Sequence, residues 1–396
     1  MLKYIEGFEL VTDQTGLAYK GYAFNNYGNK SILVGTGRNN GNSLSLASVY
    51  DAISSSVGYP WFYTSLPNLS SGVIGFAFYS NTSLDSNYRV FFGLYDTNGY
   101  VQFWLARKGN YIYLFQPTSS YSCQLNTVNT TGTISTIYDV VWNNNISWSP
   151  IADSSTSGFT IDENAWYYME IKYQLGVSGG VAVNCNSAQI LNYSSGSYNF
   201  SPSGTGFIYS NVANKFGLGY SQLSYSDAFG ESLSNQYNLF DDIYVVDLTG
   251  TKNNTFLGNV AITKMQPNSD FSTTMIPNGA ASDYLCVNDP NPNGDASYVL
   301  ATTTDLIDLY GLTAYSPIGV NILGVAVNIC ALQKSGTGSY QPAFENSSIN
   351  YYGGSTVLNG DYQTYEQVFE TKPNDNSSWT TSDLNSWKFG MKYTTP

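Results

Sequence analysis

The stretch Trp166-Tyr167-Tyr168-Met169-Glu170-Ile171-Lys172-Tyr173-Gln174-Leu175 alternates apolar and polar side chains from Met169 onward. A glycine-rich segment at 176–180 follows it, and then a second alternating run, Val181-Ala182-Val183-Asn184-Cys185-Asn186. A period of two places every second side chain on the same face of a β-strand. The two runs therefore predict a long β-hairpin with one buried face.

Similar short runs recur through the first half of the chain, at 73–79, 88–95, 100–106 and 111–115. Turn-forming residues separate them, as in Asp96-Thr97-Asn98-Gly99 and Lys108-Gly109-Asn110. A sustained helical period is absent from the sequence, apart from a short segment at 305–310 that we expect to form one or two helical turns. The pattern predicts an all-β, antiparallel fold.

The composition excludes several kinds of functional site. The 396 residues include no histidine, which rules out a Ser-His-Asp triad, a Cys-His pair and a His-ligated zinc. The net charge is −13, with lysine and arginine scattered singly, so we expect no nucleic-acid partner. The first nine residues carry charges where a secretion signal would be apolar, so we expect no such signal. No apolar run is long enough for a membrane helix, so we expect no membrane span. The four cysteines form no CxxC pair, so we expect buried free thiols, no metal site and no cofactor.

A domain boundary is predicted directly after the strand-like run 239–247. The segment 248–254 is polar and rich in turn residues, which is typical of a linker. We therefore expect two β-sandwich (jelly-roll) domains in tandem, at 1–250 and 251–396.

The hairpin beginning at Trp166, together with the strand Phe240-Asp241-Asp242-Ile243-Tyr244, resembles the concanavalin A-like (laminin-G-type) jelly roll. Further on, the segments 256–260, 295–299 and 308–310 and the terminal residues 379–392 resemble a C-terminal β module of tailed-bacteriophage virion proteins. The resemblance implies two β-sandwich domains and a structural place in the phage particle. It also implies that Phe240, Asp241 and Asp242 form a structural motif.

Carboxylate pairs are further candidates for catalytic or metal-binding groups. Retaining glycosidases need two carboxylates that face each other about 5–5.5 Å apart. The adjacent pairs Asp162-Glu163 and Asp241-Asp242 point to opposite faces of a strand, so we expect no catalytic residues and no enzymatic activity. The segment 289–295 resembles the first half of a calcium loop, but Leu300 occupies the twelfth position, so a turn rich in Asp and Asn is expected instead.

Five aromatic residues lie in polar, loop-like sequence surroundings: Trp61, Phe62, Tyr63, Trp142 and Trp148. Such rings stack on sugar faces, anchor protein interfaces or fill the core of a sandwich, and the sequence leaves these three roles open.

The expected function is therefore a non-enzymatic structural component of a bacteriophage virion. We expect it to be made in the bacterial cytoplasm and to lie on the particle exterior, as a tail, baseplate or fibre part or as capsid decoration. Its partners would be other virion proteins and further copies of itself, as a homo-oligomer. The alternative is a carbohydrate-binding module that grips a host or environmental glycan.

Overall fold

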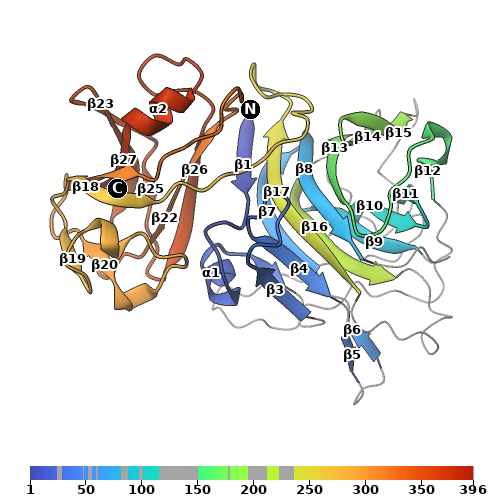
Figure 1. Cartoon of the computed structure of the whole chain (residues 1–396), viewed down its shortest axis with the longest axis horizontal. Helices are drawn as coiled ribbons and strands as arrows, with labels where there is room; N and C mark the ends of the chain where they lie inside the picture. Colours follow the sequence, from blue (N-terminus) through green and yellow to red (C-terminus); the bar gives the residue numbers. More distant parts are fainter. Residues whose placement is uncertain are drawn as a thin grey trace. The chain divides into compact units, whose positions relative to one another are not determined.

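The computed structural model describes residues 1–24, 29–47, 49–51, 56–58, 61–81, 88–97, 101–115, 150–176, 179–194, 212–222 and 236–395. Nearly all of its regular structure is antiparallel β-sheet (Figure 1), which confirms the predicted all-β class. In the part of the chain described, no helix is long and apolar enough to span a membrane. Cys185 and Cys286 are buried free thiols and Cys330 is half-buried, whereas Cys123 lies outside the described residues.

The chain forms two compact units. Unit 1 contains Tyr22–Ile262 together with Met1 and Glu6–Phe8, and unit 2 contains Thr263–Pro396 together with Leu2–Ile5 and Glu9–Gly21. The predicted limits, 1–250 and 251–396, placed the whole N-terminal segment in one domain. The compact units instead divide this segment between both.

Sheet A of unit 1 follows the order β15-β14-β13-β8-β17-β4-β3. The strands are β3 (Asn29–Leu33), β4 (Ser43–Ala47), β8 (Ser71–Ser80), β13 (Trp166–Gln174), β14 (Gly180–Cys185), β15 (Ala188–Ser194) and β17 (Tyr237–Asp247). The predicted hairpin is the β13–β14 pair, in which Met169 lies opposite Cys185 and Gln174 opposite Gly180.

Sheet B of unit 1 follows the order β12-β11-β10-β9-β16-β7-β2. The strands are β2 (Ala23–Phe24), β7 (Trp61–Leu69), β9 (Arg89–Asp96), β10 (Val101–Lys108), β11 (Tyr111–Phe115), β12 (Ala152–Asp153) and β16 (Ala213–Gln222). The smaller elements are β1 (Leu2–Glu6), α1 (Gln14–Tyr19), the pair β5 (Val49–Asp51) and β6 (Ser56–Gly58), and the 3-10 turn η1 (Ser155–Ser157).

Phenylalanine rings join the two sheets into a sandwich. Phe78 of β8 stacks on Phe91 of β9 with ring centroids 4.7 Å apart, and Phe76 stacks on Phe92 at 5.8 Å. All four rings are at most 1% exposed. Because β8 belongs to sheet A and β9 to sheet B, the core of unit 1 lies between the facing sheets.

Unit 2 is built around a sheet in the order β18-β21-β27-β23-β24, with β25 paired to β23. Two further pairs, β19–β20 and β22–β26, complete its strands. The elements are β18 (Pro267–Ser272), β19 (Ile276–Asn278), η2 (Tyr284–Cys286), η3 (Gly294–Ala296), β20 (Tyr298–Leu300), β21 (Ile307–Leu312), β22 (Val325–Ala331), β23 (Ser339–Asn346), β24 (Ile349–Tyr352), β25 (Thr356–Val357), β26 (Gln363–Phe369), α2 (Thr381–Ser386) and β27 (Lys388–Thr394).

The helical turns expected at 305–310 are wrong. The segment enters strand β21, which pairs with β18 on one side and β27 on the other. Asp308, Leu309 and Tyr310 are all buried in this position, so pairing within the sheet outweighs the weak local helical pattern.

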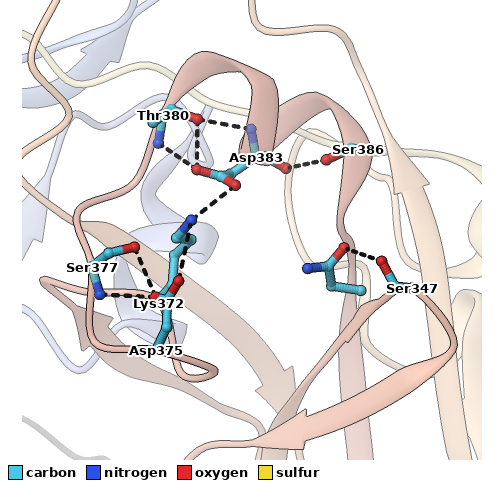
Figure 2. Close-up of polar contacts among 8 residues, drawn as sticks. Ser347, Lys372, Asp375, Ser377, Thr380, Asp383 and Ser386 are labelled. Atoms are coloured by element: carbon cyan, nitrogen blue, oxygen red, sulfur yellow. Dashed lines mark hydrogen bonds and ion pairs between the residues drawn. The ribbon is translucent and has the colours of Figure 1, made fainter.

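Helix α2 is fixed by a reciprocal capping box near the chain terminus (Figure 2). Thr380 Oγ1 accepts a hydrogen bond from the Asp383 backbone N–H at 3.2 Å, and the Thr380 N–H donates to Asp383 Oδ2 at 2.9 Å. The Lys372 ammonium lies 3.2 Å from Asp383 Oδ1. The helix thereby places Trp379 and Trp387, with ring centroids 5.2 Å apart, in the core of unit 2.

Candidate functional site

The sequence-predicted aromatic residues Trp61, Phe62 and Tyr63 lie in strand β7 and not in a loop, with exposures of 2%, 0% and 6%. The polar residues Ser65 and Asn68 occupy exposed positions in the second half of the same strand. Trp142 and Trp148 lie outside the described residues.

The buried strand β17 contains Phe240, Asp241 and Asp242. Phe240 packs on Phe76 and Phe78 with centroids 6.0 and 5.7 Å away. Asp241 Oδ2 accepts the backbone N–H of Arg38 at 2.9 Å, whereas Asp242 Oδ1 accepts that of Ile262 at 2.7 Å. Phe240 therefore packs in the core, and the two carboxylates hold the backbone at Arg38 and at Ile262.

The Arg38 guanidinium forms an ion pair with Asp242. Its Nη2 lies 2.8 Å from Asp242 Oδ2, and its Cζ lies 4.7 Å from the ring centre of Tyr168. Burial raises the pKa of Asp242, and the positive charge of Arg38 acts in the opposite direction. Asp241 and Asp242 are 2% and 1% exposed, so both carboxylates act inside unit 1.

The segment that resembles half of a calcium loop forms a hydrogen-bonded turn. Asp289 Oδ2 accepts bonds from Asn293 Nδ2 at 2.7 Å and from Ser297 Oγ at 3.0 Å. The Ser297 backbone N–H donates to Asn293 Oδ1 at 3.2 Å. Among the residues that the structure describes, no group of three or more Cys, Asp or Glu side chains has a metal-binding arrangement.

A continuous set of aromatic rings lies on the face of sheet B that points away from sheet A. Phe103 of β10 faces inward, with its centroid 6.4 Å from that of Tyr173 in sheet A. Alternation along the strand therefore turns Trp104 and Ala106 outward. We call this outer set the aromatic face: Trp61, Tyr63, Val90, Tyr95, Val101, Trp104, Ala106 and Phe115, with the partly buried Ala23, Tyr88 and Tyr113 packed against it.

Glycines let these rings lie directly on the sheet. A Cβ atom at Gly219 would lie 2.4 Å from Trp61 Cδ2, and one at Gly93 would lie 2.9 Å from Trp104 Cδ1. Trp61 and Tyr63 stack with 13° between their planes. The centre of the aromatic face is buried, since Tyr95 and Trp104 are both 0% exposed.

The accessible end of the aromatic face lies at strands β10, β11 and β12. There, half-buried Tyr88, Tyr111 and Tyr113 gather with Lys108 and Asp153, and we call these five residues the tyrosine cluster. The ring centroids of Tyr88 and Tyr113 are 5.0 Å apart with the planes at 82°. Lys108 Nζ lies 4.5 Å from the ring centre of Tyr88.

The local fold explains how these residues meet. The two-residue turn Gly109-Asn110 pairs Lys108 with Tyr111 across the β10–β11 hairpin. The short strand β12 then places Asp153 opposite Tyr113. Because alternate residues of β11 share a face, Tyr111, Tyr113 and Phe115 all project to the same side of sheet B.

The surroundings of Tyr113 favour the protonated form of its hydroxyl group. Burial raises the pKa of Tyr113 above its ordinary value, and Tyr88, Asp153 and Tyr111 add to this effect. At neutral pH the phenol therefore both donates and accepts hydrogen bonds. The cluster presents apolar ring surface edged by hydroxyl groups, one ammonium and one carboxylate.

Lys215 of β16 lies beside the aromatic face. It is half-buried, with Tyr95 and Ser65 opposite it on the neighbouring strands. Burial lowers the pKa of its ammonium, and the carboxylate of Asp96 acts in the opposite direction.

Sequence reasoning predicted the strands at 88–95 and 111–115 but did not assign the tyrosine cluster. The available signal was the alternation Tyr111-x-Tyr113-x-Phe115 directly after a turn containing Lys108. Asp153 is far along the sequence, so its position beside Tyr113 follows only from the pairing of β12.

No family model and no curated protein matches the chain. Solved structures with a similar fold include a cellulose-induced protein, at 18% identity and a TM-score of 0.41 over 65% of this chain and 100% of that one. An endo-β-1,4-glucuronan lyase from the fungus Trichoderma reesei has 11% identity and a TM-score of 0.40, over 62% of this chain and 95% of that one. A carbohydrate esterase from a Shiga toxin-encoding bacteriophage has 11% identity and a TM-score of 0.32, over 61% of this chain and 98% of that one.

The expectation that the protein has no enzymatic activity is contradicted by this set of neighbours. It includes the glucuronan lyase, the esterase and alginate lyases from a Chlorella virus and from Aplysia kurodai. The absence of histidine and of facing carboxylates excludes only the centres built from those groups. Tyrosine and lysine also transfer protons in enzymes.

Proposed function

We propose that the protein binds a carbohydrate chain at the tyrosine cluster of sheet B. The observation that carries this proposal is the arrangement of Tyr88 and Tyr113, two half-buried rings held edge to face beside Lys108 and Asp153. A sugar presents C–H groups on its faces and hydroxyl groups around its rim. The tyrosine rings can pack against the C–H groups, and the phenol, ammonium and carboxylate groups can form hydrogen bonds with the sugar hydroxyls.

A large protein interface fits the cluster less well. The core of such an interface is depleted of charged residues, and a stable one buries about 1,200–2,000 Å² in total. The tyrosine cluster instead mixes its rings with two half-buried charged residues, Lys108 at the end of β10 and Asp153 in the edge strand β12. A narrow ligand rich in hydroxyl groups uses such a surface better than a broad apolar partner does.

The test is direct measurement of oligosaccharide binding. Bacterial and environmental oligosaccharides are screened on a glycan array, and hits are measured by titration calorimetry. We expect Tyr113→Ala to weaken binding by tenfold or more, which corresponds to about 1.4 kcal/mol or more. The matched control is Tyr167→Ala, because Tyr167 is also a half-buried strand tyrosine but lies in β13 of sheet A. Loss of binding in both variants, or no binding by the wild type, contradicts the proposal.

The same samples also test for turnover. Bound polysaccharides are incubated with the protein, and new chain ends and released acyl groups are measured. Turnover that Tyr113→Ala abolishes extends the proposed function from binding to processing.

We further propose a place on the exterior of a phage particle, with other virion proteins and further copies of the chain as partners. The support is the resemblance of Phe240-Asp241-Asp242-Ile243-Tyr244 and of the residues from Trp379 onward to virion modules. Mass spectrometry of purified particles tests it, and absence of the chain from them contradicts it.

A further inference from the structure

A group of acidic side chains in unit 2 has no part in the proposed carbohydrate site. It contains the buried Asp308 of β21 and Asp283 at the start of η2, together with the exposed Asp270 of β18. Asp308 is 0% exposed and Asp283 is 6% exposed. Buried carboxylates need hydrogen-bond donors or a cation, and the donors are distributed unequally among these residues.

Asp308 is well supplied with donors. Its Oδ1 accepts the backbone N–H groups of Thr274 at 2.7 Å and Met275 at 3.0 Å. Its Oδ2 accepts the hydroxyl of Tyr310 at 3.1 Å. These bonds tie the turn between β18 and β19 to β21.

Asp283 has the opposite surroundings. Its Oδ2 is buried, and no donor in the described part of the chain reaches it. The neighbouring carboxyl group of Asp308 raises the pKa of Asp283, and the charge of Asp270 adds to this effect. Asp270 itself is held by the backbone N–H of Tyr284 at 2.7 Å, which ties η2 to β18.

Lysines on the neighbouring strand β27 do not neutralise this group. Lys388 Nζ lies over the ring of Phe271 at 5.5 Å, and Lys392 Nζ lies 2.7 Å from Asp305 Oδ1. Within the described residues, no ion pair includes Asp270, Asp283 or Asp308. Protonation of Asp283 relieves the repulsion, because the protonated oxygen becomes a hydrogen-bond donor to Asp308.

We propose that Asp283 and Asp308 form a proton-dependent latch that fastens η2 to β21 in acid and releases it as the pH rises. When protonated, Asp283 donates its O–H to Asp308 Oδ2. When the proton passes to water, two carboxylates face each other beside Asp270, and the segment 276–287 opens more often.

The sign of the pH dependence follows from the surroundings of Asp283. Burial, Asp308 and Asp270 raise its pKa from 3.8 to about 6. A raised pKa in the folded state means that the protonated form stabilises the fold. The stabilisation is complete below the ordinary pKa and is lost as the pH rises through about 6.

Hydrogen exchange of the full chain tests the latch. Protection of the segment 276–287, corrected for intrinsic exchange rates, is measured at about pH 5 and about pH 8. We expect protection to be about tenfold greater at the lower pH. Asp283→Asn replaces the proton by a permanent amide donor, so its protection is expected to be high and equal at both values.

The control is Asp289→Asn, the same substitution in the neighbouring turn, which is expected to keep the tenfold difference. Equal protection of the wild type at both pH values overturns the latch, and so does a persistent difference in Asp283→Asn. Addition of calcium is the last test. If calcium chloride at about pH 8 restores wild-type protection and a chelator removes it, the pair holds a cation in place of a proton and the latch is overturned.

Discussion

Arg38 is the residue on which the polar interior of unit 1 depends most directly. It neutralises Asp242, whose exposure is 1%, and its backbone N–H holds Asp241. Removing one member of a buried ion pair leaves an uncompensated charge, which typically costs about 3–5 kcal/mol.

We therefore expect Arg38→Met to lower the free energy of unfolding by about 3 kcal/mol, measured by urea denaturation. The control is Lys392→Met, which breaks an ion pair with Asp305, a side chain that is 75% exposed. Exposed pairs contribute about 0–1 kcal/mol. Equal effects of the two substitutions would show that the Arg38 pair is not buried as described.

A second prediction at this scale concerns Gly219 on the aromatic face. An alanine Cβ there meets Trp61 Cδ2 at 2.4 Å and forces the ring off the sheet. We expect Gly219→Ala to destabilise the protein by about 1–3 kcal/mol in urea denaturation. Gly360→Ala is the control, since no atom lies within 4 Å of its added Cβ. A neutral Gly219→Ala would mean that Trp61 does not rest on β16.

At the scale of single elements, the β13–β14 hairpin and the strands β9, β10 and β11 of sheet B were predictable from the sequence. Apolar residues recur along these strands, and turns that contain glycine mark their ends. Strand β7 was missed at Trp61, Phe62 and Tyr63 because polar residues at its exposed end hide the alternation. Strand β21 was mistaken for helical turns because its buried Asp308 makes the segment look amphipathic.

Helix α2 gives a prediction for an element that is only six residues long. Thr380→Ala removes the hydroxyl that accepts the Asp383 N–H, and loss of such a cap costs about 1 kcal/mol. We expect a lower midpoint of thermal unfolding for unit 2. Ser382→Ala, an exposed change in the same helix, is expected to leave the midpoint unchanged. A smaller effect from Thr380→Ala than from Ser382→Ala would exclude the capping box as a source of stability.

At the scale of the whole molecule, the N-terminal segment contributes to a unit whose other residues lie at the far end of the chain. The backbone N–H of Leu2 donates to Glu370 Oε1 at 2.6 Å, and that of Ile5 donates to Glu366 Oε1 at 3.2 Å. The Thr12 N–H donates to Asn291 Oδ1 at 2.6 Å. No local pattern reveals such contacts, so the sequence predicted a simple tandem at 250/251 and did not divide its N-terminal segment between two units.

A fragment containing only 263–396 therefore lacks part of unit 2. We expect it to unfold at a lower urea concentration than unit 2 does in the full chain. A synthetic peptide of residues 1–21 added to the fragment is expected to raise the midpoint, and a scrambled peptide is not. A fragment that matches the full chain without the peptide would show that Leu2–Ile5 and Glu9–Gly21 add nothing to unit 2.

This division of the N-terminal segment sets an order of events during protein synthesis. The ribosome releases the N-terminal segment long before its partners Asn291, Glu366 and Glu370, which lie 279 to 368 residues further along the chain. Unit 2 can close only after these partners have been made, and contacts so distant along a chain form slowly. Until then the N-terminal segment lacks these hydrogen bonds, and such incompletely packed segments are the ones that chaperones protect.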